Sequence, residues 1–125
     1  FRLAQALEKL EGVSVNYPLL ESSPYHELAE KQLSGKGGAI LTIRAGSKER
    51  AYKLINHLKY VKIATNIGAV RTLVIHPAST IYIHSTPEAM AEAGVYDDTI
   101  RISVGIEDIK DLIQDFTEAV ESPGE

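Results

Sequence analysis

The sequence predicts an α/β two-layer sandwich, with a mixed, largely antiparallel sheet and helices on one of its faces. Segments with helical spacing of apolar residues alternate along the chain with short segments rich in β-branched residues. In addition, some connections between strands are too short for the crossover helix that a parallel pair normally needs. Together these observations indicate one sheet face packed against helices and a second, more polar face.

The first half of the chain predicts three helices and two strands. In order, they are a helix over 2–11 that ends before Gly12, a strand over 13–17, a helix from Ser23–Pro24 to Leu33, a strand over 39–43 and a helix capped by Ser47. The serines suit helix starts because their hydroxyls accept first-turn N–H groups, and Pro24 presets a helical φ.

The second half of the chain predicts four strands and two helices. They are a brief strand over 61–64, a buried strand over 73–76 that Pro77 ends, a half-exposed strand over 80–84, a helix from Thr86–Pro87 to Gly94, a strand over 99–104, and a helix over about 107–120 before a frayed tail at 122–125. Glu107 and Asp108 are predicted to form the acidic first turn of the last helix, where carboxylates suit the helix dipole.

The strand over 99–104 shows the clearest alternation in the chain. Side chains of a strand point to opposite faces in turn. One face therefore receives Ile100, Ile102 and Val104, and the other receives Thr99, Arg101 and Ser103.

The composition excludes several classes of function. The net charge of −4 and the scattered lysines and arginines argue against a nucleic-acid partner. Cysteine is absent from the sequence, which rules out disulfides and thiolate chemistry. No apolar run approaches the ~20 residues that span a bilayer, so we expect no membrane partner and a cytoplasmic location.

The chain begins at Phe1, without Met, and already inside a helical pattern of leucines. This start predicts a piece of a longer protein. Its 125 residues are predicted to form one domain, with roughly two-thirds of the unfolded surface buried.

Neither the glycine-rich loop nor the histidines indicate a site. The loop over 35–38 (Gly-Lys-Gly-Gly) precedes a strand and lacks the phosphate-loop spacing, so it is interpreted as an ordinary turn. The four histidines, at 26, 57, 76 and 84, show no tight ligand spacing, and no metal site is predicted.

Arg101 and Asn66 are the candidate binding residues. Arg101 lies mid-strand on the polar face, where a guanidinium is able to bind a carboxylate or phosphate through two parallel hydrogen bonds. From the residues alone, a solvated strand arginine is the favoured alternative. Asn66 is equally consistent with a simple turn residue.

Two longer stretches carry a family resemblance. They are Asn-Ile-Gly-Ala-Val-Arg-Thr-Leu-Val-Ile-His-Pro-Ala-Ser-Thr over 66–80 and Ile-Arg-Ile-Ser-Val-Gly-Ile-Glu-Asp over 100–108. They resemble the C-terminal domain of the Cys/Met-metabolism family of pyridoxal-phosphate (PLP) enzymes, which have fold-type I architecture. Within that family, Asn66 and the run over 71–80 resemble the O-acetylhomoserine sulfhydrylase branch. Three positions depart from the usual pattern, with Ala69 in place of Asp and Ile81–Tyr82 in place of Thr–His.

The resemblance implies that Arg101 binds the α-carboxylate of an amino-acid substrate, with Asn66 beside it. It implies PLP as the cofactor, with its attachment lysine in a large upstream domain of the same protein, so that neither a catalytic nor a cofactor-binding residue is expected here. The implied reaction is γ-replacement, in which sulfide or a thiol displaces acetate from O-acetylhomoserine to give homocysteine or methionine. A homo-oligomer, dimer or tetramer, is also expected.

Other functions stay open at this point. A cystathionine γ-synthase or γ-lyase of the same family fits the same motifs. From a different class, a non-catalytic α/β module that binds amino acids through Arg101, or a structural domain that docks a partner, fits the residues without the family.

Overall fold

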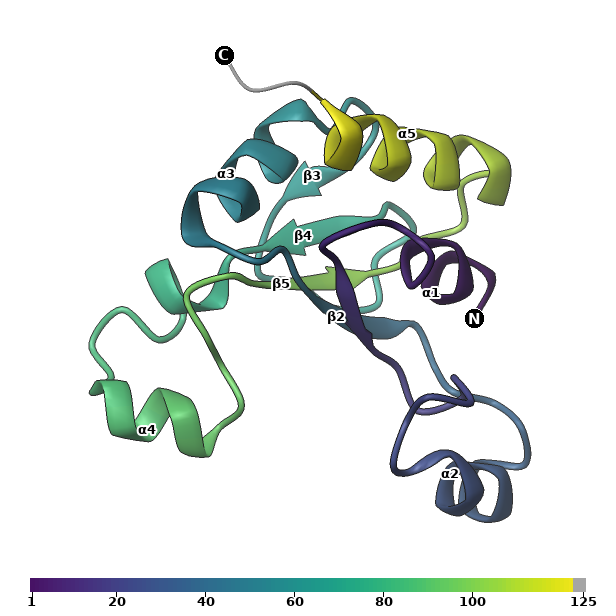
Figure 1. Cartoon of the computed structure of the whole chain (residues 1–125). Helices are drawn as coiled ribbons and strands as arrows, with labels where there is room; N and C mark the ends of the chain where they lie inside the picture. Colours follow the sequence, from purple (N-terminus) through teal and green to yellow (C-terminus); the bar gives the residue numbers. More distant parts are fainter. Residues whose placement is uncertain (123–125) are drawn as a thin grey trace.

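The computed structural model describes residues 1–122 and centres on a five-stranded sheet (Figure 1). In sheet order the strands are β1 (Ser14–Asn16), β2 (Ile40–Arg44), β5 (Thr99–Ser103), β4 (Leu73–Ile75) and β3 (Lys62–Ile63). The neighbouring pairs are antiparallel except β4 and β3, which run parallel. The predicted mixed, largely antiparallel sheet is therefore confirmed.

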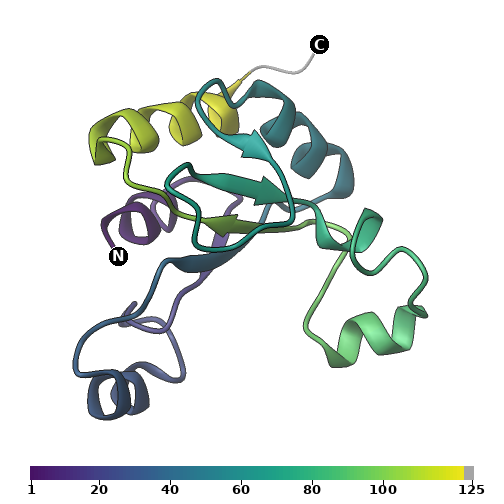
Figure 2. The ribbon, with the colours of Figure 1, turned by 180° about the vertical axis from the view of Figure 1, so that it is seen from behind.

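The helices confirm the two-layer arrangement. The three that cover one face are α1 (Arg2–Leu7), α3 (Lys48–His57) and α5 (Ile109–Glu121). α1 and α3 each contact α5 in this layer, whereas α2 (His26–Leu33) and α4 (Pro87–Glu92) lie on the other side of the sheet and apart from each other (Figure 1 and Figure 2). A 3₁₀ turn, η1 (Pro77–Ser79), follows β4.

The core lies between the sheet and the layer of α1, α3 and α5. Ile100 and Ile102 of β5 are both 0% exposed, and they belong to the same apolar cluster as Phe116 of α5. Burial of one such side chain stabilises a fold by about 1.5–3 kcal/mol. The alternation predicted for β5 is thus confirmed on its apolar side, and it directs Arg101 to the face without these helices.

Two predicted helix caps are confirmed by hydrogen bonds. The Ser47 hydroxyl accepts the Arg50 N–H at the start of α3, and the Thr86 hydroxyl accepts the Ala89 N–H at the start of α4. Gly94, with φ of +69°, follows the end of α4 as predicted.

The strand predicted over 80–84 is wrong. These residues form successive turns, in which the Tyr82 N–H donates to the Pro77 carbonyl and the Ser85 N–H donates to the Tyr82 carbonyl. Ile81 and Ile83, the apolar half of the alternation, are 50% and 62% exposed. Alternation alone does not make a strand where no neighbouring strand pairs with the segment.

The end of the first predicted helix and the start of the second shift. α1 ends at Leu7 instead of residue 11, because Lys9 and Leu10 donate to carbonyls three residues back in tighter turns. α2 begins at His26, after a turn in which the Tyr25 N–H donates to the Ser23 hydroxyl. The tail predicted to fray over 122–125 lies, beyond Ser122, outside the described residues.

At α5 the predicted role of Glu107 is wrong. Asp108 caps the helix by accepting the Lys110 N–H, and the helix begins at Ile109. Glu107 therefore lies before the helix, and its carboxylate binds another part of the chain.

Candidate functional site

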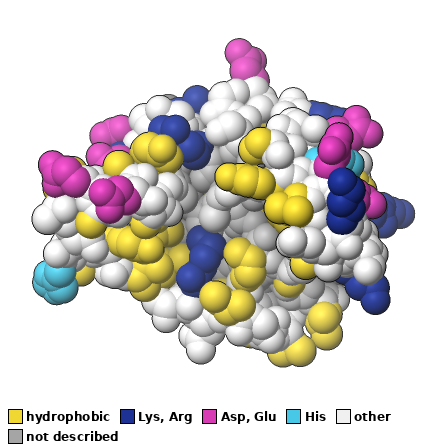
Figure 3. Space-filling view, turned by 90° about the horizontal axis from the view of Figure 1, so that it is seen from below, with side chains coloured by type: hydrophobic (Ala, Val, Ile, Leu, Met, Phe, Trp, Pro, Cys, Tyr) yellow, Lys and Arg dark blue, Asp and Glu magenta, His cyan; other side chains and the backbone are white. Residues whose placement is uncertain are grey.

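Arg101 occupies the middle of the sheet on the face opposite α3 and α5. It lies on β5 between Thr42 of β2 and Ile75 of β4, its register partners on either side. Neighbouring strands on both sides hold the backbone at this position, which makes it a rigid base for a long side chain. Figure 3 shows this face, with a central hollow that contains Lys or Arg side chains and apolar side chains around it.

The segment over 64–72, which we call the return loop, crosses this face. It joins β3 to the parallel strand β4, and parallel strands are normally joined by about a dozen or more residues that form a helix. Because these few residues form no helix, the chain returns directly along β5. Three backbone groups of the loop contact β5 and the residues after it, in the order Thr65, Gly68 and Val70.

The first of these contacts orients Arg101. Its Nη2 donates to the Thr65 carbonyl oxygen at 2.7 Å. This bond uses one of the several N–H donors of the guanidinium and leaves the rest for a ligand. The ion pairs within residues 1–122 are Arg44–Asp98 and Lys59–Glu118, so the described chain offers Arg101 no carboxylate. A planar cation held in this way is suited to bidentate binding of an external carboxylate.

Asn66 directly follows the residue that Arg101 contacts. Its side chain is exposed, and it stands at the start of the return loop. The fold therefore brings the segments of the two candidate residues together, although they are far apart in the sequence.

The far end of the return loop is held by residues that the sequence interpretation missed. Glu107 accepts the Thr72 N–H at 2.6 Å through Oε1 and the Thr72 hydroxyl at 2.7 Å through Oε2. The Gly105 N–H in turn donates to the Thr72 hydroxyl oxygen at 2.9 Å. Burial raises the pKa of the Glu107 carboxyl, but the hydrogen bonds from Thr72, together with the backbone N–H of Glu107 and the charge of Arg71, leave the pKa below its ordinary value. The signal in the sequence is the Ser-Val-Gly-Ile-Glu motif over 103–107, which carries the family resemblance but does not reveal Thr72 as the partner of Glu107.

Gly105 is required by close approach of the loop. A Cβ atom at this position would overlap the Val70 carbonyl oxygen and the backbone of Arg71. The Ile106 N–H donates to that same Val70 oxygen at 2.9 Å. Only glycine lets the return loop lie this close to the end of β5.

His76, which ends β4 in extended conformation as predicted, has a structural role. Its Nε2 lies 2.6 Å from the Asp97 carbonyl oxygen, and because a carbonyl only accepts, Nε2 carries the proton. Its Nδ1 lies 2.8 Å from the Ser79 hydroxyl. These bonds attach the 3₁₀ turn to the segment before β5. Over residues 1–122, no cluster of His, Asp and Glu has the arrangement of a metal site.

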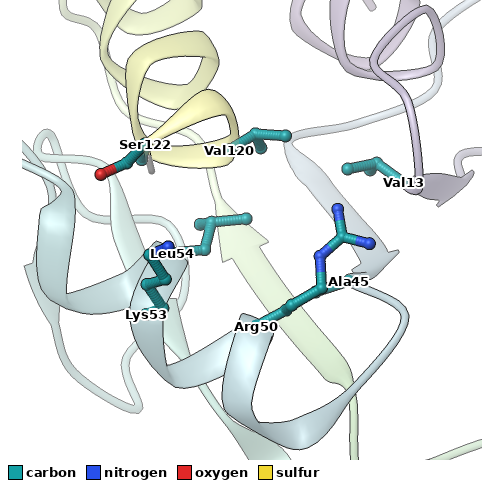
Figure 4. A pocket seen from close by; sticks show the side chains of 8 residues that line it. Val13, Ala45, Arg50, Lys53, Leu54, Val120 and Ser122 are labelled. Carbon is teal, nitrogen blue, oxygen red and sulfur yellow. The ribbon is translucent and has the colours of Figure 1, made fainter. Parts of the chain in front are cut away.

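A separate cavity of about 220 Å³ lies on the helix-covered side, between α3 and α5. In Figure 4 the Arg50 guanidinium points from α3 toward Val13, and Leu54 and Val120 line the wall. Arg50 Nη2 donates to the Glu11 carbonyl at 3.4 Å, which links α3 to the turn before β1. The sheet separates this cavity from Arg101.

The described residues do not fit the attachment of an aldehyde cofactor. Such attachment needs a neutral, sheltered lysine amine. Every lysine within residues 1–122 is exposed or half-buried. Lys59 forms a hydrogen bond and an ion pair with Glu118, and this carboxylate raises its pKa, which favours the charged form.

None of the helices within residues 1–122 is long and apolar enough to cross a membrane.

Comparison with known proteins identifies the relatives of this chain. Residues 1–121 match the family model for Cys/Met metabolism PLP-dependent enzymes. The chain is 43% identical to O-acetyl-L-homoserine sulfhydrylase 1 of Thermus thermophilus, over 91% of this chain and 27% of the relative. It is 45% identical to homocysteine synthase of Schizosaccharomyces pombe, over 97% of this chain and 29% of the relative.

Solved structures agree with this assignment. A Campylobacter jejuni crystal structure, described as an O-acetylhomoserine (thiol)-lyase with pyridoxyl-lysine monophosphate, superposes with a TM-score of 0.89 at 34% identity. The alignment covers 97% of this chain and 29% of that one. The chain thus spans less than a third of the length of these relatives, and it belongs to the Cys/Met-metabolism family of PLP-dependent enzymes.

Proposed function

We propose that residues 1–125 are the C-terminal, substrate-carboxylate-binding domain of an enzyme that replaces the acetate of O-acetylhomoserine with sulfide or a thiol. The relatives' names support this reaction class, since two of them are a homoserine-ester sulfhydrylase and a homocysteine synthase. The observation that carries the proposal is the Arg101 guanidinium, which the Thr65 carbonyl orients and which no carboxylate of residues 1–122 neutralises.

The role of this chain is to bind and orient. Arg101 holds the α-carboxylate of the amino acid through two hydrogen bonds, which fixes the direction of the bonds at the α-carbon. Asn66, one residue beyond the Thr65 anchor, contributes a side-chain amide to the same carboxylate. PLP, held by an upstream domain of the same protein, supplies the electron sink for the bond changes at the substrate. We further infer a cytoplasmic homo-oligomer.

The test is Arg101→Ala in the full-length enzyme. Truncation of one member of a buried, hydrogen-bonded charge pair costs about 2–5 kcal/mol. We therefore expect kcat/KM for O-acetylhomoserine to fall roughly 30-fold to several thousandfold. Arg101→Lys should recover only part of this loss, because an ammonium lacks the planar fork of the guanidinium. The absorbance of the bound cofactor should not change.

Arg50→Ala is the matched control, because it removes a guanidinium on the helix-covered side of the sheet. It should leave kcat/KM within a few-fold of the wild type. A near-normal kcat/KM in Arg101→Ala, or a loss of the cofactor from that variant, would contradict the proposal.

A further inference from the structure

Both oxygens of the Glu107 carboxylate bind the same residue of the return loop. Its two oxygens accept the backbone N–H and the hydroxyl of Thr72, and Thr72 is 0% exposed. Hydrogen bonds to an ionised acceptor are about twice as strong as neutral ones. The two hydrogen bonds between Thr72 and Glu107 therefore fix the position at which the return loop enters β4.

A third group closes the arrangement. The Gly105 N–H donates to the Thr72 hydroxyl oxygen, which obliges that hydroxyl to direct its own hydrogen toward Glu107. Thr72, Gly105 and Glu107, which we call the loop clasp, thus form a directional set in which each donor has one acceptor. The clasp joins the turn after β5 to the segment before β4.

The clasp acts on Arg101 through the return loop. The β3–β4 pair holds both ends of the loop, because the Lys62 N–H donates to the Thr72 carbonyl and the Ala64 N–H donates to the Val74 carbonyl. Between these ends, the Thr65–Arg101 bond and the Gly68 N–H on the Ser103 hydroxyl attach the loop to β5. Because the Lys62 N–H donates to the Thr72 carbonyl, displacement of Thr72 shifts the end of the β3–β4 pair that leads into Thr65 and Asn66. The Arg101 guanidinium then loses the carbonyl that sets its orientation.

From this geometry we infer that Glu107 is a positioning residue for the substrate-carboxylate site, acting through Thr72 and the return loop on Arg101 and Asn66. The inference rests on the proposed function, because it assigns to Glu107 the support of that site. The Ser-Val-Gly-Ile-Glu motif, which contains Gly105 and Glu107, then supports the substrate site in addition to forming the turn after β5. Glu107 does not contact the substrate in this role.

Glu107→Gln in the full-length enzyme tests the inference with little change of shape. An amide presents one oxygen and one NH₂, so one of the two Thr72 donors faces another donor. Because one hydrogen bond is lost and its donor is left unsatisfied, we expect KM for the amino-acid substrate to rise roughly 10-fold, with a smaller change in kcat. Thr72→Val should give a similar rise, and Thr72→Ser, which keeps the hydroxyl, should recover most of it.

Asp115→Asn is the control for a purely structural effect. Asp115 is also a carboxylate that accepts backbone N–H groups, from Lys59 and Tyr60, but it lies on α5 in the helix layer. The Asp115→Asn variant should have a lower melting temperature than the wild type but an unchanged KM for the amino-acid substrate. An equal rise in KM for this variant would overturn the inference, because it would show that loss of stability alone is sufficient.

A double-mutant cycle with Arg101 separates the two proposals. If the clasp acts through Arg101, Glu107→Gln should add little to the loss of kcat/KM already present in Arg101→Ala. The same factor in both backgrounds, or an unchanged KM in Glu107→Gln alone, would refute the positioning role while the substrate site stands. A normal kcat/KM in Arg101→Ala refutes the proposed function, and the inference with it.

Discussion

Ile100 and Ile102 on one face of β5 are held by apolar burial, whereas Arg101 and Ser103 on the other face hold the return loop by hydrogen bonds. Apolar burial is non-directional and contributes most of the folding free energy. Hydrogen bonds add less net stability but require defined distances and angles. One strand thus separates the two tasks, with stability on the helix side and atomic positions on the open side.

The largest expected effect is on the free energy of unfolding, from a substitution that changes only the helix-covered side of the sheet. Phe116→Ala removes a fully buried ring from α5 and should lower the free energy of unfolding of the 125-residue chain by about 3–5 kcal/mol. Urea denaturation monitored by circular dichroism measures this change. Ile106→Ala is the control, since Ile106 is 81% exposed, and should change stability by less than ~0.5 kcal/mol. Equal losses in the two variants would contradict the assignment of stability to the helix side.

An intermediate effect is expected from a substitution that changes only the open side of the sheet, where the return loop lies. Gly105→Ala introduces a Cβ into the Val70 carbonyl and should displace the return loop, at a cost of about 1–3 kcal/mol. Hydrogen exchange should accelerate at the Gly68 and Ile106 amides, which donate to Ser103 and Val70, and stay slow in the β2–β5 ladder. Gly94→Ala is the control, because it strains a left-handed residue after α4 but meets no atom within 4 Å, and it should leave both amides unchanged. Faster exchange throughout the sheet would show that the two faces are not separable.

The smallest expected effect is the pH dependence of the stability that Glu107 contributes on the open side. Because the pKa of Glu107 is lower in the folded chain than its ordinary value of 4.5, its contribution is complete above that value and is lost as the pH falls through the folded pKa. The stability gap between wild type and Glu107→Gln should therefore be constant near neutral pH and narrow as the pH falls below about 4.5. Urea midpoints from pH 7 to pH 3 measure it. A stability difference between the two proteins that grows as the pH falls would contradict the lowered pKa of Glu107.

Local signals in the sequence were sufficient for much of this fold. The alternation over 99–104 gave the correct face for Arg101, and Ser47 and Thr86 gave correct helix starts, because each depends on neighbours only a few residues away. The strand over 80–84 failed because a strand needs a partner, which its own alternation does not reveal. Glu107 was misplaced for a similar reason, since its partner Thr72 lies 35 residues away.

The site itself was predictable only in part. The resemblance suggested Arg101 and Asn66 as a pair, and the structure places their segments side by side. Thr65 acts through its backbone carbonyl, so its side-chain type carries no signal. The path of the return loop follows from a parallel β3–β4 pair, and no residue pattern within 64–72 indicates that pairing.

The position of α2 and α4 outside the helix layer has a consequence for sequence divergence. Among their residues α2 buries Ala29 and α4 buries none, whereas four of the five residues of β5 are buried. Substitutions in α4 and in the turns before it thus cost little folding free energy, so family members are free to vary there. The Ile81–Tyr82 departure from the usual family pattern falls in these turns, where Ile81 is 50% exposed and its replacement costs this chain little buried apolar surface.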